Sequence, residues 1–193
     1  MSEHHDLGDP TDEDLIRAFI ETGDQDAITD LLRRHESRVY GLAYRLLGNR
    51  PDAQDATQEV FISVLRKAKT FRFQSAFSTW LYRLTINASH DLRRKTSRAP
   101  IPTEDVSPES PDEVTSSLDR MAIDEALRHI PYDQMEAVVL RDLFGATYDE
   151  IAEATGVPVG TVKSRIARGR LQLFELLGEP TDDPTRLIKR ENQ

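Results

Sequence analysis

Residues 147–177, TYDEIAEATGVPVGTVKSRIARGRLQLFELL, constrain the fold more than any other segment because they predict two helices joined by a tight turn. Thr147 and Glu150 have the spacing of a capping box, in which each side chain bonds an unpaired amide at the start of a helix. Gly156 suits the left-handed end of that helix, and Pro158 suits the start of the next one. The segment therefore predicts a helix-turn-helix.

The second of these helices has an apolar face and a basic face. A spacing of three and four residues marks the packed face at Val159, Val162, Ile166, Gly169 and Leu173. The outward face and its flanks carry Thr161, Lys163, Ser164, Arg165 and Arg168. No Asp or Glu occurs between residues 154 and 174, although the formal net charge of the chain is -9. Such a helix can enter the major groove of DNA, and the alternative is an amphipathic helix whose basic face is only solvated.

Composition narrows the class of protein. A chain of 193 residues has room for one or two small domains. It has no Cys, its five His residues lack metal-ligand spacing, and it shows no Ser/His/Asp or phosphate-loop pattern. We therefore expect no metal, no cofactor and no catalytic site. No apolar run is long enough to cross a membrane and no signal peptide is present, which indicates a cytoplasmic protein without membrane insertion.

Charge is segregated along the chain. Residues 83–98 contain five basic residues and one acid, whereas residues 99–117 contain five acids, four prolines and no basic residue. The second composition is typical of a linker rather than of a packed core. We predict an all-α protein with two small helical domains, residues 11–96 and 118–178. An acidic Pro-rich linker at residues 97–117 joins them, and a disordered acidic end at residues 1–10 and a polar tail at residues 179–193 flank them.

Capping residues predict four helices in the first domain. Thr11 can cap the first helix, and a longer helix runs from about residue 26 to residue 47, where Gly48 ends it. Asn49 with Pro51 opens the third helix, and Ser78 is the expected cap of the fourth.

The third helix has two contrasting faces. Its expected inward face comprises Val60, Phe61, Val64, Leu65 and Ala68. The opposite face carries Asp55, Gln58, Glu59, Ile62 and Arg66. This opposite face is either an ordinary solvated surface or a docking surface for a partner, because a single exposed Ile does not distinguish the two.

The sequence predicts a second basic face on the fourth helix. Its packed stripe is Leu81, Leu84, Ala88 and Leu92, which leaves Arg83, Asn87, His90 and Arg94 outward and Trp80 at the margin. Basic residues interleaved with aromatic ones suit single-stranded nucleic acid, because bases stack on rings and phosphates pair with cations. Core packing is an equal alternative for Trp80 and Tyr82. Phe71 and Phe73 in the preceding loop either contact nucleic acid or only fill space in the packing of the loop.

Three runs together resemble the extracytoplasmic-function (ECF) group of bacterial sigma factors. They are DAQDATQEVFISVLRK at residues 52–67, FRFQSAFSTWLYRLTINASHDLRRK at residues 71–95, and YDEIAEATGVPVGTVKSRIARGRLQL at residues 148–173. The runs stand in the order of that family and cover both domains. The resemblance implies a sigma factor, which is not an enzyme, that binds core RNA polymerase and directs promoter-specific transcription initiation. It also implies an anti-sigma protein as a partner.

The resemblance assigns one task to each run. The first corresponds to the docking surface for the coiled coil of the polymerase's largest subunit, with Asp52, Asp55, Gln58, Glu59 and Ile62 as expected contacts. The second corresponds to the element that reads and opens minus-ten DNA and holds a flipped base in its loop, with Phe73, Trp80, Arg83, Asn87, His90, Arg93 and Arg94 expected there. The third corresponds to the minus-thirty-five reader, with Thr161, Lys163, Ser164, Arg165 and Arg168 expected on DNA.

Two alternatives remain open at this point. A stand-alone helix-turn-helix regulator would bind duplex DNA unaided but leaves residues 11–96 unexplained. A sigma-like decoy that only binds an anti-sigma protein would keep the packed faces and lose the basic ones, against which Lys163, Arg165, Arg168, Arg93 and Arg94 argue. Residues 99–117 would reach about 65 Å when fully extended, comparable to two turns of DNA at ~34 Å each.

Overall fold

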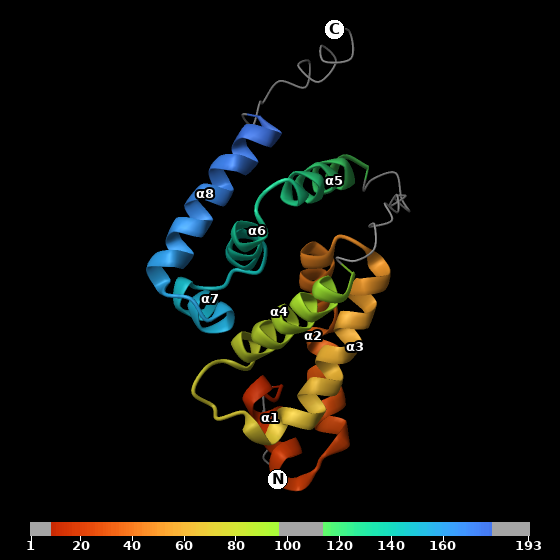
Figure 1. Cartoon of the computed structure of the whole chain (residues 1–193). Helices are drawn as coiled ribbons and strands as arrows, with labels where there is room; N and C mark the ends of the chain where they lie inside the picture. Colours follow the sequence, from red (N-terminus) through yellow and green to blue (C-terminus); the bar gives the residue numbers. More distant parts are fainter. Residues whose placement is uncertain (1–8, 97–113, 179–193) are drawn as a thin grey trace, which may run out of the picture.

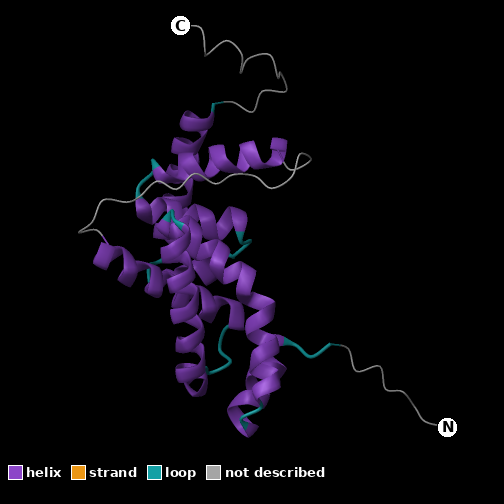
Figure 2. Ribbon diagram, turned by 90° about the vertical axis from the view of Figure 1, so that its right-hand side faces the viewer, coloured by secondary structure: helices purple, strands orange, loops and turns teal. Residues whose placement is uncertain are grey.

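The structure is a computed structural model that describes residues 9–96 and 114–178, and within these ranges every regular element is helical (Figures 1 and 2). In chain order the elements are α1 (Asp12–Thr22), α2 (Gln25–Leu47), α3 (Arg50–Lys67), a 3-10 turn (Ala68–Thr70), α4 (Phe77–Thr96), α5 (Val114–Arg128), α6 (Tyr132–Val138), a π-helical turn (Val139–Leu143), α7 (Tyr148–Thr155) and α8 (Val159–Leu177). The all-α prediction with a helix-turn-helix, α7 and α8, is confirmed. Most of the predicted acidic end, most of the linker and all of the polar tail lie outside the described residues.

Most helix boundaries follow the caps that the sequence predicts. Thr11 forms a capping box at the start of α1, and Thr147 with Glu150 forms a second one at the start of α7. Gly156 ends α7 with a φ of 73°, a left-handed conformation that a residue with a side chain rarely adopts. Asn49 caps α3 as predicted.

Two predicted boundaries differ from the structure. Helix α4 begins at Phe77, one position before the predicted cap Ser78, because the amides of Thr79 and Trp80 already donate to the carbonyl of Ala76. Helix α5 begins at Val114, inside the segment predicted as linker.

The amino-terminal core lies between α1, α2, α3 and α4 (Figure 1). Its most deeply buried side chains include Ile16, Ile28, Leu31, Val60, Val64 and Phe77. Leu65, predicted on the inward face of α3, is instead 45% exposed. The buried row on this helix includes Ala56, Val60 and Val64, four residues apart, and Leu65 lies one position beyond it.

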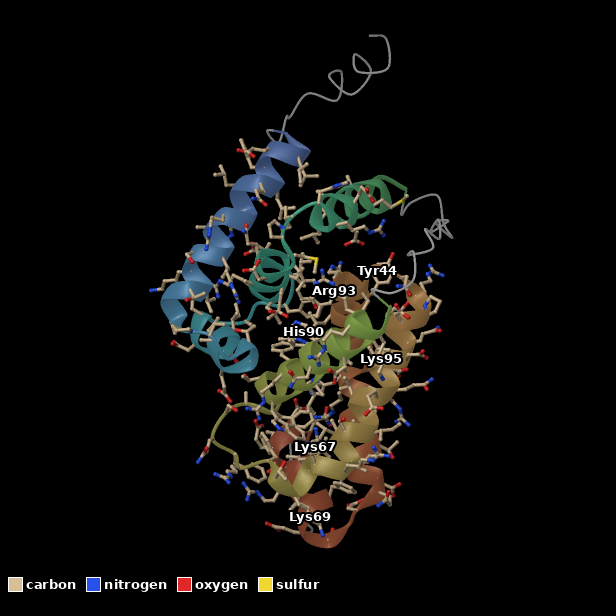
Figure 3. The ribbon with its side chains drawn as sticks, viewed as in Figure 1. Tyr44, Lys67, Lys69, His90, Arg93 and Lys95 are labelled. Carbon is tan, nitrogen blue, oxygen red and sulfur yellow. The ribbon has the colours of Figure 1, made fainter. Side chains whose placement is uncertain are left out.

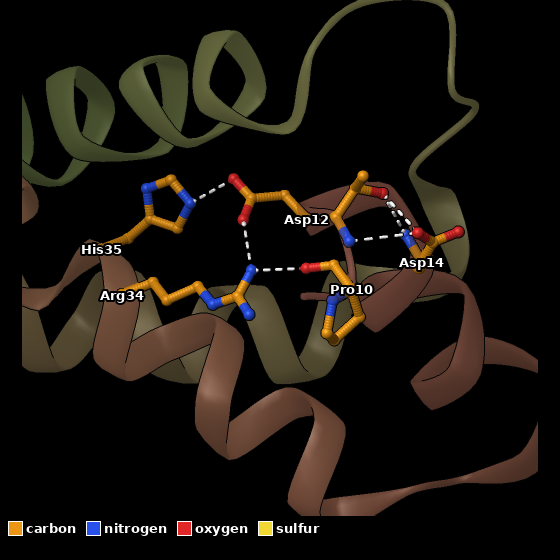
Figure 4. Close-up of polar contacts among 6 residues, drawn as sticks. Pro10, Asp12, Asp14, Arg34 and His35 are labelled. Atoms are coloured by element: carbon orange, nitrogen blue, oxygen red, sulfur yellow. Dashed lines mark hydrogen bonds and ion pairs between the residues drawn. The ribbon is translucent and has the colours of Figure 1, made fainter. Parts of the chain in front are cut away.

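A polar cluster fixes α1 to α2 (Figure 4). The Asp12 carboxylate lies 2.6 Å from His35 Nε2 and 3.7 Å from Arg34 Nη1. Arg34 Nη1 also donates to the carbonyl of Pro10 at 2.6 Å. The His35 ring is buried and meets the Phe77 ring edge-on, with centroids 5.4 Å apart. The start of α1 is therefore tied to the amino-terminal core.

A second core joins the two domains. Helices α2 and α4 contribute Leu42, Leu46, Tyr82 and Ile86 to it, and the carboxy-terminal helices contribute Leu127, Met135, Leu140, Ile151, Val162 and Ile166. Arg38 adds a polar contact across the junction, because its Nε donates to the Tyr82 hydroxyl at 2.8 Å and its Nη2 donates to the Phe144 carbonyl at 2.6 Å. Arg45 Nε lies 3.5 Å from Asp124 Oδ1. The carboxy-terminal domain is thus packed onto α2 and α4.

Within the carboxy-terminal domain, α8 crosses α6 at Gly169. A Cβ atom on Gly169 would lie 2.7 Å from Val138 Cγ2 and 3.2 Å from the Gln134 carbonyl oxygen. A Cβ atom on Gly160 of the same helix would meet nothing within 4 Å.

We therefore expect Gly169→Ala to lower the free energy of unfolding by up to about 2 kcal/mol, because the added methyl group must push α8 away from α6. This net effect is an overpacking cost of about 1–3 kcal/mol less a helix propensity gain of roughly 1 kcal/mol. The matched control Gly160→Ala should keep the stability or raise it. Urea unfolding followed by circular dichroism measures both, and equal stability of the two variants would contradict the close approach.

Candidate DNA and partner interfaces

The outer face of α3 combines acidic and apolar residues. Asp55, Gln58 and Glu59 are exposed, as predicted. Ile62 is 39% exposed, and Leu65 adds a second exposed apolar side chain to the same end of the helix. Apolar side chains bordered by polar ones are typical of a protein-protein interface. We call the five residues the α3 face.

Asp52 differs from the residues of the α3 face. It is half-buried, and its Oδ2 accepts a hydrogen bond from Asn49 Nδ2 at 3.0 Å. The Asp52 amide in turn donates to Asn49 Oδ1 at 2.9 Å. The side chain predicted for docking therefore completes the cap of α3, and we leave it out of the α3 face.

Helix α4 buries two of its faces, whereas the sequence predicts one. Leu81, Leu84 and Ala88 enter the amino-terminal core as predicted. Tyr82 and Ile86 enter the core that joins the domains. The remaining surface of α4 leaves four of the predicted minus-ten residues exposed, namely Arg83, Asn87, Arg93 and Arg94.

Trp80 and Phe73, the two aromatic residues predicted to contact minus-ten DNA, both pack against the amino-terminal core. Trp80 is only 6% exposed and packs against Phe71 and Phe77, with centroids 5.4 and 5.8 Å away. The ring belongs to the core in this structure, so its expected contact with DNA stays a prediction that requires the ring to turn outward. Phe73 is half-buried, meets the edge of Phe71 at 4.8 Å, and lies 4.2 Å beneath the Arg17 guanidinium.

Two predicted minus-ten residues contact the carboxy-terminal domain (Figure 3). His90 Nε2 lies 2.9 Å from Glu136 Oε1, and the Arg93 guanidinium lies 3.9 Å from the centroid of the Tyr132 ring. The His90 and Tyr132 rings are 5.3 Å apart. Burial raises the pKa of the Tyr132 hydroxyl far above its ordinary value, so this group stays protonated and neutral.

An open groove of about 780 Å³ follows α4 at this junction. It is lined by Lys67, Asn87, His90, Asp91, Arg93, Arg94 and Tyr132. Positive charge dominates it, because the one carboxylate, on Asp91, is paired with Arg94. Such a groove suits a nucleic-acid backbone. The sequence did not single out Lys67 or Tyr132 as groove residues. Lys67 could have been included because it is the last basic residue of α3, whereas Tyr132 reaches the groove only when the chain folds.

The contact between α4 and α7 uses a carboxylate that also caps a helix. Thr79 Oγ1 donates to Glu150 Oε1 at 3.0 Å, while Glu150 Oε2 accepts from the Thr147 amide at 2.7 Å. The backbone bond from Thr147 is the main cause that lowers the pKa of the Glu150 carboxyl, and the hydroxyls of Thr147 and Thr79 add to it. Glu150 therefore stays ionised at neutral pH and serves both contacts.

Only part of the predicted DNA-binding face of α8 is exposed to solvent. Lys163, Ser164 and Arg168 are exposed, whereas Thr161 and Arg165 are half-buried. Arg168 folds along the helix, since its Nε donates to the Ser164 carbonyl and its Nη2 lies 3.2 Å from Ser164 Oγ.

Arg165 already has an intramolecular partner. Its Nε lies 3.0 Å from Asp133 Oδ2 on α6. This pair connects α8 to α6, which gives Arg165 a structural role. Ser164 and Arg168 are both exposed and lie side by side on the outer face of α8.

No helix among residues 9–96 and 114–178 is long and apolar enough to span a membrane. The same residues contain no group of three or more side chains placed to hold a metal ion.

The family comparisons match both domains. Residues 31–99 match Sigma-70 region 2, and residues 120–173 match Sigma-70, region 4. The chain is 39% identical over 194 residues to the ECF RNA polymerase sigma factor SigE of Mycolicibacterium smegmatis, covering 92% of this chain and 74% of SigE. It is 38% identical over 169 residues to the ECF RNA polymerase sigma factor SigM of Mycobacterium tuberculosis, covering 87% of this chain and 85% of SigM.

Two solved structures share the fold. The sigma factor RpoE of Bartonella quintana, solved in complex with the anti-sigma factor NepR, has a TM-score of 0.71 at 26% identity and covers 79% of this chain and 98% of RpoE. CnrH, solved in complex with the cytosolic domain of CnrY, has a TM-score of 0.68 at 23% identity, with coverage of 89% and 100%. Both alignments extend beyond either domain alone, so the shared fold includes both domains.

Proposed function

The chain belongs to the ECF RNA polymerase sigma factors, and we propose that its two domains divide core docking and promoter recognition between them. The observation that carries this proposal is the pair of basic surfaces, the α4 groove and the outer face of α8, in a chain of net charge -9. Phosphate contacts need Lys and Arg, so these surfaces suit DNA despite the overall charge.

In this proposal the α3 face binds core polymerase, and the α4 groove binds the unpaired minus-ten strand. Arg83, Asn87 and Arg94 are exposed along α4, so a strand can reach them without rearrangement of the chain. Ser164 and Arg168 of α8 read the minus-thirty-five bases, and Lys163 contacts phosphate. Because core polymerase and DNA are both in the bacterial cytoplasm, the chain acts there.

Promoter opening in this proposal requires no covalent chemistry by the chain. Binding energy for the unpaired strand can shift the melting equilibrium of DNA, since a ligand that prefers one state populates that state. We therefore propose that the chain is not an enzyme.

The packed arrangement of the domains has a consequence for DNA binding. Promoter elements named for positions minus ten and minus thirty-five are more than two DNA turns apart, or roughly 70 Å at ~34 Å per turn. Helices α4 and α7 touch through Thr79 and Glu150, so they cannot serve both elements at once. We infer that the domains separate when the chain acts with polymerase.

Reconstitution tests this function against the alternative of a stand-alone regulator. The purified chain and core polymerase should co-elute, and only their mixture should retain promoter DNA specifically. Specific retention of duplex DNA by the chain without core polymerase would favour the stand-alone regulator.

We also propose that an anti-sigma protein binds this chain. The support is the similarity to RpoE, which was solved with the anti-sigma factor NepR and shares both domains with this chain. Such a partner would act by covering the α3 face or the basic helices. Affinity purification from the source cells should recover it, and recovery of polymerase alone under every growth condition would count against it.

A pair of substitutions on α8 separates base reading from phosphate contact. Arg168→Ala should cost about 1–3 kcal/mol of promoter binding and relax the preference at one upstream position, if Arg168 reads a guanine edge. Lys163→Ala should instead weaken binding to all sequences alike and lower the salt slope by about one. A salt titration of holoenzyme on promoter variants distinguishes them. If both variants bind like the wild type, α8 does not read DNA.

A further inference from the structure

The loop between the 3-10 turn and α4 contains an unusual backbone conformation. Phe73 has a φ of 55°, and it is the one non-glycine residue with positive φ among the described residues. A bulky side chain makes this conformation unfavourable, so surrounding contacts must hold it. Strained backbone of this kind is concentrated at ligand-binding and switch regions, which makes the contacts of Phe73 informative.

Two contacts hold the Phe73 ring against the amino-terminal core. The edge of Phe71 lies 4.8 Å away between centroids, and the Arg17 guanidinium lies 4.2 Å above the ring. A cation above an aromatic face is attracted by the negative face of the ring. The other contact of Arg17, a 4.0 Å ion pair with Glu21, is largely exposed and adds little.

Arg17 comes from α1, which precedes the residues that match Sigma-70 region 2. Figure 1 shows α1 beside the end of α3, where the loop begins. An element outside the matched region therefore holds the loop that precedes α4.

The inward position of Phe73 decides which loop residues face solvent. Its neighbours Arg72 and Gln74 are both exposed. The Gln74 amide offers a donor and an acceptor together, the combination with which Gln recognises adenine. The aromatic ring that the sequence singled out is thus an anchor, and the side chain beside it is free to meet a base.

We propose that Arg17 is a positioning residue that clamps Phe73 inward so that Gln74 faces an unpaired base of the minus-ten strand. This inference rests on the proposed function of the α4 region. It goes further in assigning base discrimination to Gln74 and its support to α1.

The test uses holoenzyme assembled from full-length chain and core polymerase, with a randomised single-stranded DNA library as the probe. Sequencing of the bound strands gives the base preference at every position. Gln74→Ala should reduce the preference at one position by about tenfold, the size expected when a bidentate base contact is lost. Arg17→Ala should reduce the preference at that same position, and Arg17→Lys, which keeps the cation, should restore part of it.

Two further variants control for loss of fold. Glu21→Ala removes the other partner of Arg17 and should leave the preference unchanged. Phe73→Gly tolerates a φ of 55° but removes the ring, so it should flatten the preference as Arg17→Ala does. Phe73→Gly should lower the unfolding temperature because it removes a packed ring, but each variant should still unfold cooperatively and keep a core affinity near that of the wild type.

Wild-type preference at every position for a folded Arg17→Ala or Phe73→Gly variant would overturn the positioning role. Wild-type preference for Gln74→Ala would overturn the assignment of the base contact. A wild-type holoenzyme with no base preference at all would overturn the proposed minus-ten function itself, which is a separate result.

Discussion

Replacing Asp55 and Glu59 together with Lys should lower the affinity of the chain for core RNA polymerase by about a hundredfold or more. Both side chains are exposed, and no ion pair joins either of them to another described residue. The substitutions therefore leave the fold intact and place two positive charges on a face whose acidic residues suit a basic partner surface. Like charges facing each other across an interface cost several kcal/mol, which corresponds to this loss. Anisotropy titration of labelled chain with core polymerase measures it.

The charge-matched control reverses Glu36 on α2 and Glu153 on α7, which are also exposed. The control changes the net charge by the same amount but spares the α3 face, so its core affinity should stay near that of the wild type. Equal affinities for the two double variants would mean that α3 is not the docking helix.

Covalent linkage of α4 to α7 should reduce promoter-directed transcription by about a hundredfold or more, because a linked chain cannot extend over roughly 70 Å of DNA. The chain has no Cys, so Thr79→Cys with Glu150→Cys introduces the two thiols that a short bismaleimide can join. The side-chain oxygens at these positions are 3.0 Å apart. Core affinity should persist because the α3 face is untouched. Run-off transcription with core polymerase is the measurement.

Each single-Cys chain, modified with the same reagent, controls for the loss of the Glu150 cap, which alone costs about 1 kcal/mol. A cross-linker that contains a disulfide adds a second control, since reduction should restore transcription. Full activity of the linked chain would show that the domains work in the packed arrangement.

The sequence predicts the local structure well, because helix starts and ends depend on neighbouring residues. The capping box of Thr147 and Glu150 and the left-handed Gly156 are examples, and both are confirmed. Contacts between distant residues could not be predicted in this way. From the sequence alone, Tyr82 could lie in the core or on the surface, because the packed stripe of its helix is formed by other residues. Its contact with Phe144 is visible only in the folded chain.

The candidate site could be predicted as a set of faces but not residue by residue. Charged side chains on a predicted face look equivalent in sequence, yet Asp52 is paired with Asn49 and Arg165 with Asp133. Trp80 was ambiguous because its position at the margin of the helix suited both core and groove. Burial decides these cases, and burial depends on which helices pack together.

The most direct test of the division of labour between the two domains is transcription of genomic DNA from the source organism by core polymerase with and without the chain. Sequencing of the 5′ ends of the transcripts shows where initiation depends on the chain. We predict a set of chain-dependent 5′ ends that share two upstream sequence elements, of which the distal one changes with Arg168→Ala and the proximal one with Gln74→Ala. Absence of chain-dependent 5′ ends, or ends that share no upstream element, would contradict the account.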